Sequence, residues 1–401
     1  MNGKDLYWLW LSSLSEVSLN AKAALLEVFG SPEAAFLSPK GSFTRIDGIS
    51  RRDAALLEER DLTAAESIPA FCKERDVRII TYENGEYPQR LKEIFAPPSV
   101  LYVRGTLPNL DEELPVAVIG TRHASDYGLK MGRNIAYELS KCGAVVVSGL
   151  TAGVDAAAAE GALAAGGICI GVLGTPIDAA KSSLAKRVCR KGALISEYAP
   201  GTAQMKTFFR ARNRIAAGIS LGVVVAEAPE KSGTRLFVAE ALEQGKEIFA
   251  VPGNADSETS AGTIRFLREG AQLVTHGWEV AEELDSLLPG ILNTASRESY
   301  PVVARPADED PPPEKKRKPP QKKRLDKEKS ACYIDISDAI AALTEPQRQI
   351  VLSVISGCSS ADEIIETTGL SASLVLSQLT MLEIKGFIRR DAGNGIVIRE
   401  K

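Results

Sequence analysis

The stretch from Pro115 to Asp155 constrains this chain most, because its pattern predicts a strand, a glycine turn, a helix, a second strand and a second glycine turn. The apolar runs Val116–Ile119 and Ala144–Val147 are short and continuous, as in parallel strands buried on both faces. Asp126–Cys142 between them carries apolar residues at helical spacing. Two parallel strands joined by a helix both end at one edge of a sheet, where ligands of open α/β sheets bind.

The two loops at this edge are rich in Gly, Ser and Thr. Such loops can turn backbone N–H groups toward an anion, with a helix N-terminus behind each loop. The first loop contributes Gly120, Thr121 and Arg122, and the second contributes Ser148, Gly149 and Gly153. We therefore expect this edge of the sheet to bind phosphate.

Strands and helices alternate through the middle of the chain, which predicts a doubly wound parallel α/β sheet. Further strands are expected at Val77–Thr81, in the last part of Ala96–Gly105, and at Cys169–Leu173, Ala193–Ser196, Val223–Glu227, Glu247–Val251 and Gln272–Thr275. Further helices are expected at Asp155–Ala165, Ala179–Cys189, Asn213–Gly218, Thr234–Gln244, Thr263–Arg268 and Trp278–Leu287.

A chain of 401 residues is too long for one ordinary domain. Residues 1–70 are predicted to form a helical domain, in which residues 46–50 resemble the turn of a helix-hairpin-helix module. A plain turn between packed helices is favoured there, because the turn has one glycine and a carboxylate. The sheet domain is predicted for residues 71–290, and the Pro- and Lys-rich residues 291–332 should form a disordered linker.

Residues 333–401 carry the pattern of a winged helix. Helices are expected at Glu345–Ser356, Ala361–Thr368 and Ser371–Lys385, followed by a hairpin of Phe387–Arg390 and Ile396–Arg399. Sequence-specific DNA recognition needs hydrogen-bond donors on the third helix, which has few. Docking to a protein or weak DNA contact is therefore favoured for this domain.

Composition limits the kinds of partner and the compartment. The formal net charge is −4, from 48 basic and 52 acidic residues, so nucleic-acid binding requires a local basic patch. The six cysteines show no CxxC spacing, as expected for reduced cysteines of a cytoplasmic protein. The N-terminal apolar run is too short for a signal peptide, and no stretch approaches a membrane span.

The remaining turns expected at the binding edge add basic residues and aromatic rings. They contribute Gly174, Thr175, Lys206, Phe209, Arg210, Arg212, Asn213, Arg214, Ser232 and Gly233. Several phosphates along one strand suit such a groove better than a single nucleotide, with an aromatic ring available to stack on a base. The competing hypothesis is that the arginines pair with Glu197, Glu227 or Glu230. Three arginines at alternate positions of a loop favour the groove.

No convincing catalytic, cofactor or metal motif is present. The first turn is GTRHAS rather than GxGxxG, no carboxylate follows the second strand, and no GxxxxGK[ST] motif occurs, so no nucleotide cofactor is expected. The two histidines, His123 and His276, lie in unrelated stretches, and no metal-ligand spacing is found. Asp155 is better explained as the cap of a helix that begins at Ala156 than as a base.

Several motifs in order resemble one family. They are GTRHASDYG, VVSGLTAGVDAAAAEGAL, GVLGTPID, FRARNRIAAG, EAPEKSGT and ALEQGKEIFAVPG, preceded by YPQRLKEIFAPPSVLYVRG. The chain thus resembles the DNA-processing protein A (DprA/Smf) family. The resemblance implies a sterile-alpha-motif-like helical domain, an extended Rossmann-like domain and an optional winged helix. It also implies a non-enzymatic protein that binds and protects single-stranded DNA, loads the RecA recombinase in natural transformation and dimerises through the Rossmann-like domain.

The resemblance also carries over individual residues of the DNA site. These are Gly120, Arg122, Ser148, Gly149, Gly174, Arg212, Asn213 and Arg214, while Ser232 and Gly233 match the Ser-Gly turn of the family. The chain departs from the family pattern at Ala152, where a basic residue is common, and at residues 180–184, where Tyr-Pro-x-x-Asn is usual. Arg210 stands where the family has proline.

Two other functions remain open from the sequence. A nucleoside-phosphate hydrolase could use a similar glycine-rich edge, with Asp155 or Glu227 as the acid or base. A DNA-binding regulator could act through residues 333–401, which the sparse third helix argues against.

Overall fold

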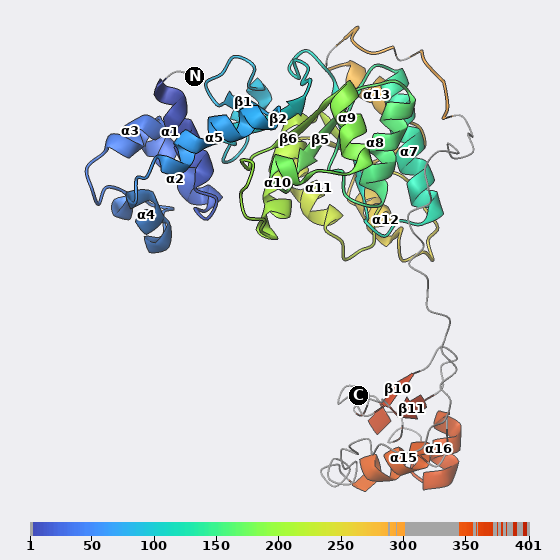
Figure 1. Cartoon of the computed structure of the whole chain (residues 1–401). Coiled ribbons are helices and arrows are strands. Elements are labelled where there is room, and N and C mark those ends of the chain that lie inside the picture. Colours follow the sequence, from blue (N-terminus) through green and yellow to red (C-terminus); the bar gives the residue numbers. More distant parts are fainter. Residues whose placement is uncertain are drawn as a thin grey trace, which may run out of the picture. The chain divides into compact units, whose positions relative to one another are not determined.

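A computed structural model of the chain describes residues 3–300, apart from 288 and 294, and within the C-terminal part residues 345–355, 358, 360–371, 375, 378–379, 382, 388–390 and 396–398. The chain divides into two compact units, Met1–Pro306 and Ala307–Lys401 (Figure 1). The division into four parts expected from the sequence stays a prediction. Most of the expected linker, from residue 301 onward, lies outside the described residues.

The first unit is built on a nine-stranded mixed sheet. Its strands are β1 (Arg78–Thr81), β2 (Val100–Gly105), β3 (Pro115–Gly120), β4 (Val145–Ser148), β5 (Cys169–Leu173), β6 (Ala193–Ser196), β7 (Gly222–Glu227), β8 (Glu247–Ala250) and β9 (Gln272–Leu273). Their order is β1-β2-β6-β5-β4-β3-β7-β8-β9. Strands from β6 to β9 in this order pair in parallel, whereas β2 is antiparallel to both β1 and β6. The predicted α/β fold class is confirmed.

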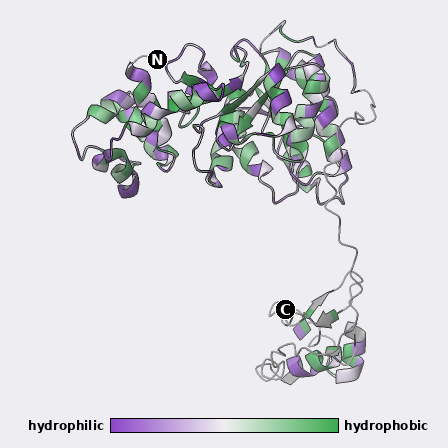
Figure 2. Ribbon diagram, viewed as in Figure 1, coloured by the Kyte–Doolittle hydropathy of each residue, from purple (hydrophilic) through white to green (hydrophobic). Residues whose placement is uncertain are grey.

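Helices cover both faces of the sheet. They are α7 (Asp126–Lys141), α8 (Val154–Ala164), α9 (Ser183–Lys191), α10 (Thr207–Ile219), α11 (Thr234–Glu243), α12 (Ala261–Arg268) and α13 (Gly277–Asp285). Alternate strand residues point to opposite faces, so Val116 and Val118 of β3 pack under α7 and α8, whereas Ala117 and Ile119 pack under α10 and α11. The strands between these layers are mostly hydrophobic (Figure 2).

The strand order places a binding edge beside β3. The chain runs from β3 through β4 and β5 to β6 on one side, then returns to add β7 on the other side of β3. This reversal is a topological switch point, and crevices form there outside the carboxyl ends of the strands. The turn after β3 is held by Glu227, which accepts hydrogen bonds from the amide (2.8 Å) and hydroxyl (2.6 Å) of Ser125, the N-cap of α7.

Two helix starts differ from the expectation. Helix α10 begins at Thr207 rather than Asn213, so the arginines at 210, 212 and 214 lie on a helix and not on a loop. The N-cap residue Lys206 makes no side-chain capping bond, so the usual sequence signal for a helix start is missing. Helix α9 begins at Ser183 after a short 3₁₀ turn at Ile177–Ala179, because Ser182 caps it.

The N-terminal helices pack on one end of the sheet. They are α1 (Gly3–Ser13), α2 (Leu19–Phe29), α3 (Pro32–Leu37), α4 (Arg51–Glu58) and α5 (Thr63–Glu74), with a 3₁₀ turn at Phe43–Arg45 and the short α6 (Gln89–Lys92) further along. Their core, which includes Trp10 and Leu25, is continuous with the core on the α7 face of the sheet. The hydroxyls of Ser12 and Tyr102 are hydrogen-bonded at 3.1 Å and join α1 to β2.

The second unit is described only in part. It contains α15 (Glu345–Ile355), α16 (Ala361–Thr368) and the antiparallel pair β10 (Ile388–Arg390) and β11 (Ile396–Ile398) around a small apolar core. Most of the expected third helix and the whole hairpin turn lie outside the described residues. The side-chain oxygen of Gln378, on the expected third helix, accepts a hydrogen bond from the Gln347 amide (2.8 Å).

No helix in the described ranges is both long and apolar enough to cross a membrane. Five of the cysteines are described, and all of them are free thiols: Cys72, Cys142, Cys169, Cys189 and Cys358. Burial raises the pKa of the Cys169 thiol to about 12, so this side chain behaves as an apolar core residue.

Candidate nucleic-acid interface

A cavity of about 640 Å³ opens at the carboxyl edge of the sheet, beside the end of β3. Ten of the predicted site residues line it: Gly120, Thr121, Arg122, Lys206, Phe209, Arg210, Arg212, Asn213, Ser232 and Gly233. We call this cavity the carboxyl-edge groove. Its side chains come from the turn after β3, the start of α10 and the turn before α11, which are distant in sequence. Five basic and two acidic side chains line it.

An exposed arginine and an aromatic ring meet in this groove. The guanidinium carbon of Arg122 lies 5.4 Å from the centre of the Phe209 ring, within range of a cation–π contact. Phe209 remains 37% exposed, whereas its neighbour Phe208 is buried and stacks on Tyr198 at 3.6 Å. Of the two adjacent rings, Phe209 is therefore the one available to a base.

Arg212 forms the buried floor of the groove. It is 6% exposed and packs against Gly149, where a Cβ atom would lie only 1.9 Å from Arg212 Nη1 and 2.5 Å from Asp155 Oδ2. Burial raises the pKa of Asp155, and the Arg212 guanidinium, the Thr151 hydroxyl and the Gly120 amide oppose this shift. Burial likewise lowers the pKa of Arg212, opposed by Asp155. Gly149 thus provides the space in which these two charges sit together.

Other predicted residues shape the loops without lining the groove. The Ser148 hydroxyl is buried, donates to the carbonyl of Asp155 (2.8 Å) and accepts from the Leu150 amide (3.1 Å). Gly153 has a φ of +83°, and a Cβ there would lie 2.2 Å from the Thr121 carbonyl. Only glycine fits this close approach of two loops.

Gly174 and Thr175 directly follow β5, and Gly174 lies against the start of α10. A Cβ at Gly174 would lie 2.8 Å from the Cα of Phe209, so glycine lets the helix approach the end of β5. The carbonyl of Thr175 accepts a hydrogen bond from the Ser196 hydroxyl at 2.7 Å. Neither residue lines the groove, but Gly174 helps to position Phe209, which does.

Arg214 does not join the groove. In a helix, residues two apart point about 200° from each other, so Arg214 faces away from Arg212. It is 3% exposed and donates to Glu197 at 2.5 Å. The competing hypothesis of internal pairing therefore holds for Arg214, while Arg122 and Arg210 show no carboxylate partner among the ion pairs of the described residues.

Sequence reasoning left several groove residues out of the predicted site. Lys231 is exposed beside Ser232, and His123, Thr151 and Leu236 also line the cavity. For Lys231 a signal was present, since the basic residue directly precedes the Ser-Gly turn. For Leu236 there was none, because an apolar residue at a helix start is normally assigned to the core.

The two candidate acids or bases are held by structural hydrogen bonds. Glu227 accepts from Ser125 and from the Thr259 hydroxyl (2.7 Å), which fixes three loops. Asp155 accepts from the Thr151 hydroxyl at 3.0 Å. The expectation that Asp155 caps its helix is wrong, since α8 begins at Val154 with Gly153 at the N-cap, and Asp155 lies in the first turn. No described group of His, Cys, Asp or Glu could hold a metal ion.

The fold and this groove define a Rossmann-like protein with a basic groove at the carboxyl edge of its sheet. The profile of the family described as DNA recombination-mediator protein A matches residues 78–285, and that of the DprA winged helix domain matches residues 337–394. The chain belongs to the DNA recombination-mediator protein A family. The predicted winged helix and the predicted DprA/Smf family are thereby confirmed.

Individual relatives agree with this assignment. The DNA processing protein DprA of Streptococcus pneumoniae is 39% identical over 203 residues, which are 50% of this chain and 71% of the relative. The DprA of Bacillus subtilis is 33% identical over 219 residues, 54% of this chain and 74% of the relative. The crystal structure of the S. pneumoniae protein superposes with a TM-score of 0.59 at 32% identity, covering 71% of this chain and 98% of that one.

Proposed function

We propose that this protein binds single-stranded DNA in the carboxyl-edge groove, protects it and loads the RecA recombinase onto it in natural transformation, without catalysing a reaction. The observation that carries the proposal is the convergence of Arg122, Lys206 and Arg210 from separate segments on one groove. Point charges, backbone amides of glycine turns and one exposed ring are what a polynucleotide strand requires.

The excess of basic over acidic side chains favours a chain of phosphates over a single small ligand. Arg122, Lys206, Arg210 and Lys231 are exposed at the groove, so each can neutralise a separate phosphate. Single strands bound in this way release counterions, and their affinity falls steeply with salt. Phe209 adds a surface on which any base can stack, which fits binding without sequence preference.

Binding rather than catalysis is favoured by the state of the two carboxylates. Both Asp155 and Glu227 accept hydrogen bonds that hold loops together, and Asp155 lies next to the buried Arg212. A general base needs a free lone pair within reach of its substrate proton. We therefore assign both carboxylates a structural role, and place the protein in the cytoplasm, where a recombinase acts.

The proposed homodimer uses the sheet domain. Strand β9 is two residues long and lies at the edge of the sheet, and Leu273 on it is 58% exposed. The exposed apolar side chain at this edge offers surface that a second copy can cover.

The test removes two exposed groove cations in Arg122→Ala/Lys206→Ala. Binding of a fluorescent oligothymidine should weaken about 100-fold at low salt, and the slope of log K against log salt should fall by about 1.4, since each single-strand phosphate contributes about 0.7. The matched control Lys186→Ala/Lys191→Ala removes two exposed cations from α9, outside the groove. Equal binding by the two double variants would show that the groove is not the site.

The enzyme hypothesis is tested separately by incubating the protein with nucleoside monophosphates and following base release by chromatography. We expect no turnover. Turnover that disappears in Asp155→Asn would instead establish the hydrolase.

A further inference from the structure

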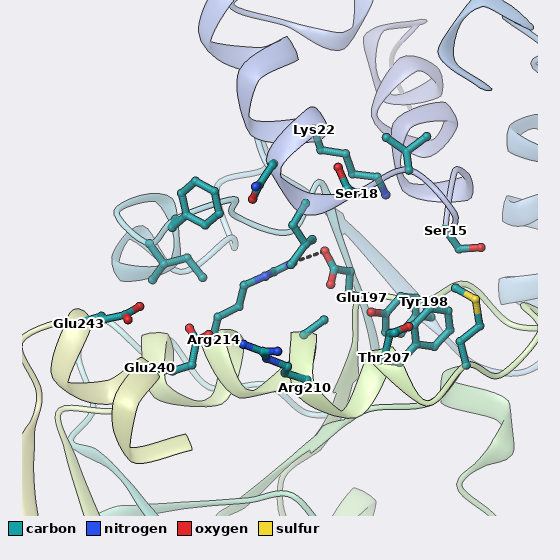
Figure 3. Close-up of a pocket in the computed structure, with 18 of the residues that line it drawn as sticks. Ser15, Ser18, Lys22, Glu197, Tyr198, Thr207, Arg210, Arg214, Glu240 and Glu243 are labelled. Atoms are coloured by element: carbon teal, nitrogen blue, oxygen red, sulfur yellow. Dashed lines mark hydrogen bonds and ion pairs between the residues drawn. The ribbon is translucent and has the colours of Figure 1, made fainter. Parts of the chain in front are cut away.

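A second and larger cavity (Figure 3) has a volume of about 900 Å³. The residues of α10 that line it show that it lies on the other side of this helix from the groove. We call it the second hollow. Its walls come from the start of α2, the loop before β2, the end of β6, α10 and α11. Arg214 extends from α10 across the hollow to Glu197, with Lys22 on α2 above them (Figure 3).

The polar lining of this hollow has an unmatched donor group on Arg214 and unmatched acceptor atoms on Glu197 and Gln244. Arg214 donates to Glu197 Oε1, but its Nη1 and Nε have no hydrogen-bond partner, and neither does Glu197 Oε2. Both residues are more than nine-tenths buried. Buried polar groups are normally satisfied, so the pair fits a ligand edge that accepts from Arg214 and donates to Glu197 side by side.

The charge balance favours a neutral ligand over a phosphate at this position. Six basic and five acidic side chains line the hollow, compared with five and two in the groove. Glu240 and Glu243 flank the arginines, and carboxylates at that position repel an anion. A neutral ligand with adjacent donor and acceptor atoms is required instead, and the edge of a nucleobase has this pattern.

An exposed ring supplies the stacking surface. Phe95 lines the hollow and is 64% exposed. This exposure is unusual, because phenylalanine side chains are normally buried. It is followed by Ala96 in the left-handed region, at a φ of +50°, which is unfavourable for alanine. The chain thus holds Phe95 outward at a conformational cost.

The two cavities share Arg210. Lys206, Phe209 and Asn213 of the α10 segment face the groove, while Thr207, Ala211 and Arg214 face the second hollow, as the helical repeat dictates. Arg210 lies between these faces and lines both cavities. A phosphate held by Arg210 would therefore have the groove on one side and the hollow on the other.

We propose that the second hollow binds a nucleobase of the strand whose phosphates lie in the carboxyl-edge groove, stacked on Phe95 with its edge on Arg214 and Glu197. This inference rests on the proposed function. It makes the first turn of α10 a ridge over which the strand passes, with phosphates bound on one side and a base on the other.

The experiment compares a 12-nucleotide oligothymidine with an abasic oligonucleotide of equal length and phosphate number. Phe95→Ala should weaken binding of the oligothymidine about tenfold, leave the abasic strand unaffected and leave the salt slope unchanged, since stacking involves no counterion. Phe71→Ala is the matched control, because Phe71 is 43% exposed and lines neither cavity.

A second variant tests the polar floor. Glu197→Gln replaces an acceptor-only group by one that also donates, so the relative affinities for oligo-dA, oligo-dC and oligo-dT should change by severalfold. A purely structural role of Glu197 would change all three equally. Unchanged binding by Phe95→Ala together with an unchanged ranking in Glu197→Gln would overturn the proposal.

If the wild-type protein binds no oligonucleotide, the proposed function fails, and this result is distinct from failure of the base site. Free deoxynucleosides are then titrated by calorimetry. Binding that is lost in Phe95→Ala would support the hollow as a base site, and absence of binding would overturn it.

Discussion

The two cavities beside α10 differ in charge although one helix supplies part of both. Five basic side chains line the groove with only two acidic ones, whereas the second hollow has nearly equal numbers, six basic and five acidic. The helix carries arginines toward both sides, and the segments opposite decide what each arginine does. Gly149 leaves room for Arg212, while Glu197 at the end of β6 pairs with Arg214.

Breaking the ion pair of the second hollow should have the largest effect on stability. Arg214→Met leaves Glu197 charged, 7% exposed and without its partner, and should lower the free energy of unfolding by about 4 kcal/mol. Urea denaturation measures the change. Arg265→Met, which removes the exposed pair with Glu269, should cost less than about 0.5 kcal/mol.

The double variant Arg214→Met/Glu197→Leu sharpens this result. If the cost comes from the stranded carboxylate, the second substitution should recover most of the stability. No recovery would mean that Arg214 acts by packing instead.

A substitution that fills the floor of the groove should have the next largest effect on stability. Gly149→Ala places a Cβ atom 1.9 Å from Arg212 Nη1, and should cost about 3 kcal/mol and abolish most of the DNA affinity as Arg212 is displaced. Thermal unfolding measures the loss of stability, and oligothymidine binding measures the loss of DNA affinity. Gly85→Ala is the matched control, because a Cβ there meets nothing within 4 Å, its φ lies outside the left-handed region, and it lines neither cavity. A fully active Gly149→Ala protein would contradict this account of the floor.

All nine strands could be located from the sequence, because most of them are short runs rich in apolar residues and bounded by glycine or polar residues. The same pattern placed both glycine loops at one edge. It did not reveal where α10 begins, since Lys206–Arg212 has no cap signal, and the alternate spacing of the arginines was attributed to a loop. On a helix, that spacing sends Arg212 and Arg214 to different cavities.

The long-range partners could be anticipated only as candidates. Glu197 was named as a partner for an arginine, but the choice of Arg214 depends on the order of β5, β6 and α10 in space. The contact of Gly149 with Arg212 and the exposure of Phe95 have no local signal at all. These features come from tertiary packing, which a single sequence does not encode residue by residue.

The charge of Lys22 should have a smaller effect on stability, and this effect should depend on pH. Burial lowers the pKa of Lys22 from 10.5 to about 8, partly opposed by Glu197. Below pH 8, Lys22 is protonated in both the folded and the unfolded protein, so the cost of burying its charge destabilises the fold in full. Between pH 8 and 10.5 the unfolded chain holds a proton that the folded protein has released, so stability is gained as the pH rises.

Lys22→Met should therefore stabilise the protein at pH 7 by about 2 kcal/mol, and this advantage over wild type should shrink toward pH 10.5. Urea denaturation of both proteins at pH 7, 9 and 10.5 provides the comparison. A difference that does not vary with pH would show that Lys22 is not buried as a charge in the second hollow.

Removing a single cation from the rim of the groove should have the smallest effect. Lys231 is exposed beside the Ser232–Gly233 turn, so Lys231→Ala should weaken oligothymidine binding only about threefold at moderate salt while lowering the salt slope by about 0.7. Folding should be unaffected, because the side chain makes no ion pair within the described residues. The salt slope distinguishes two roles for Lys231. A threefold loss of affinity with an unchanged slope would mean that Lys231 orders the turn rather than neutralising a phosphate. The groove would then bind one phosphate fewer than its exposed cations suggest.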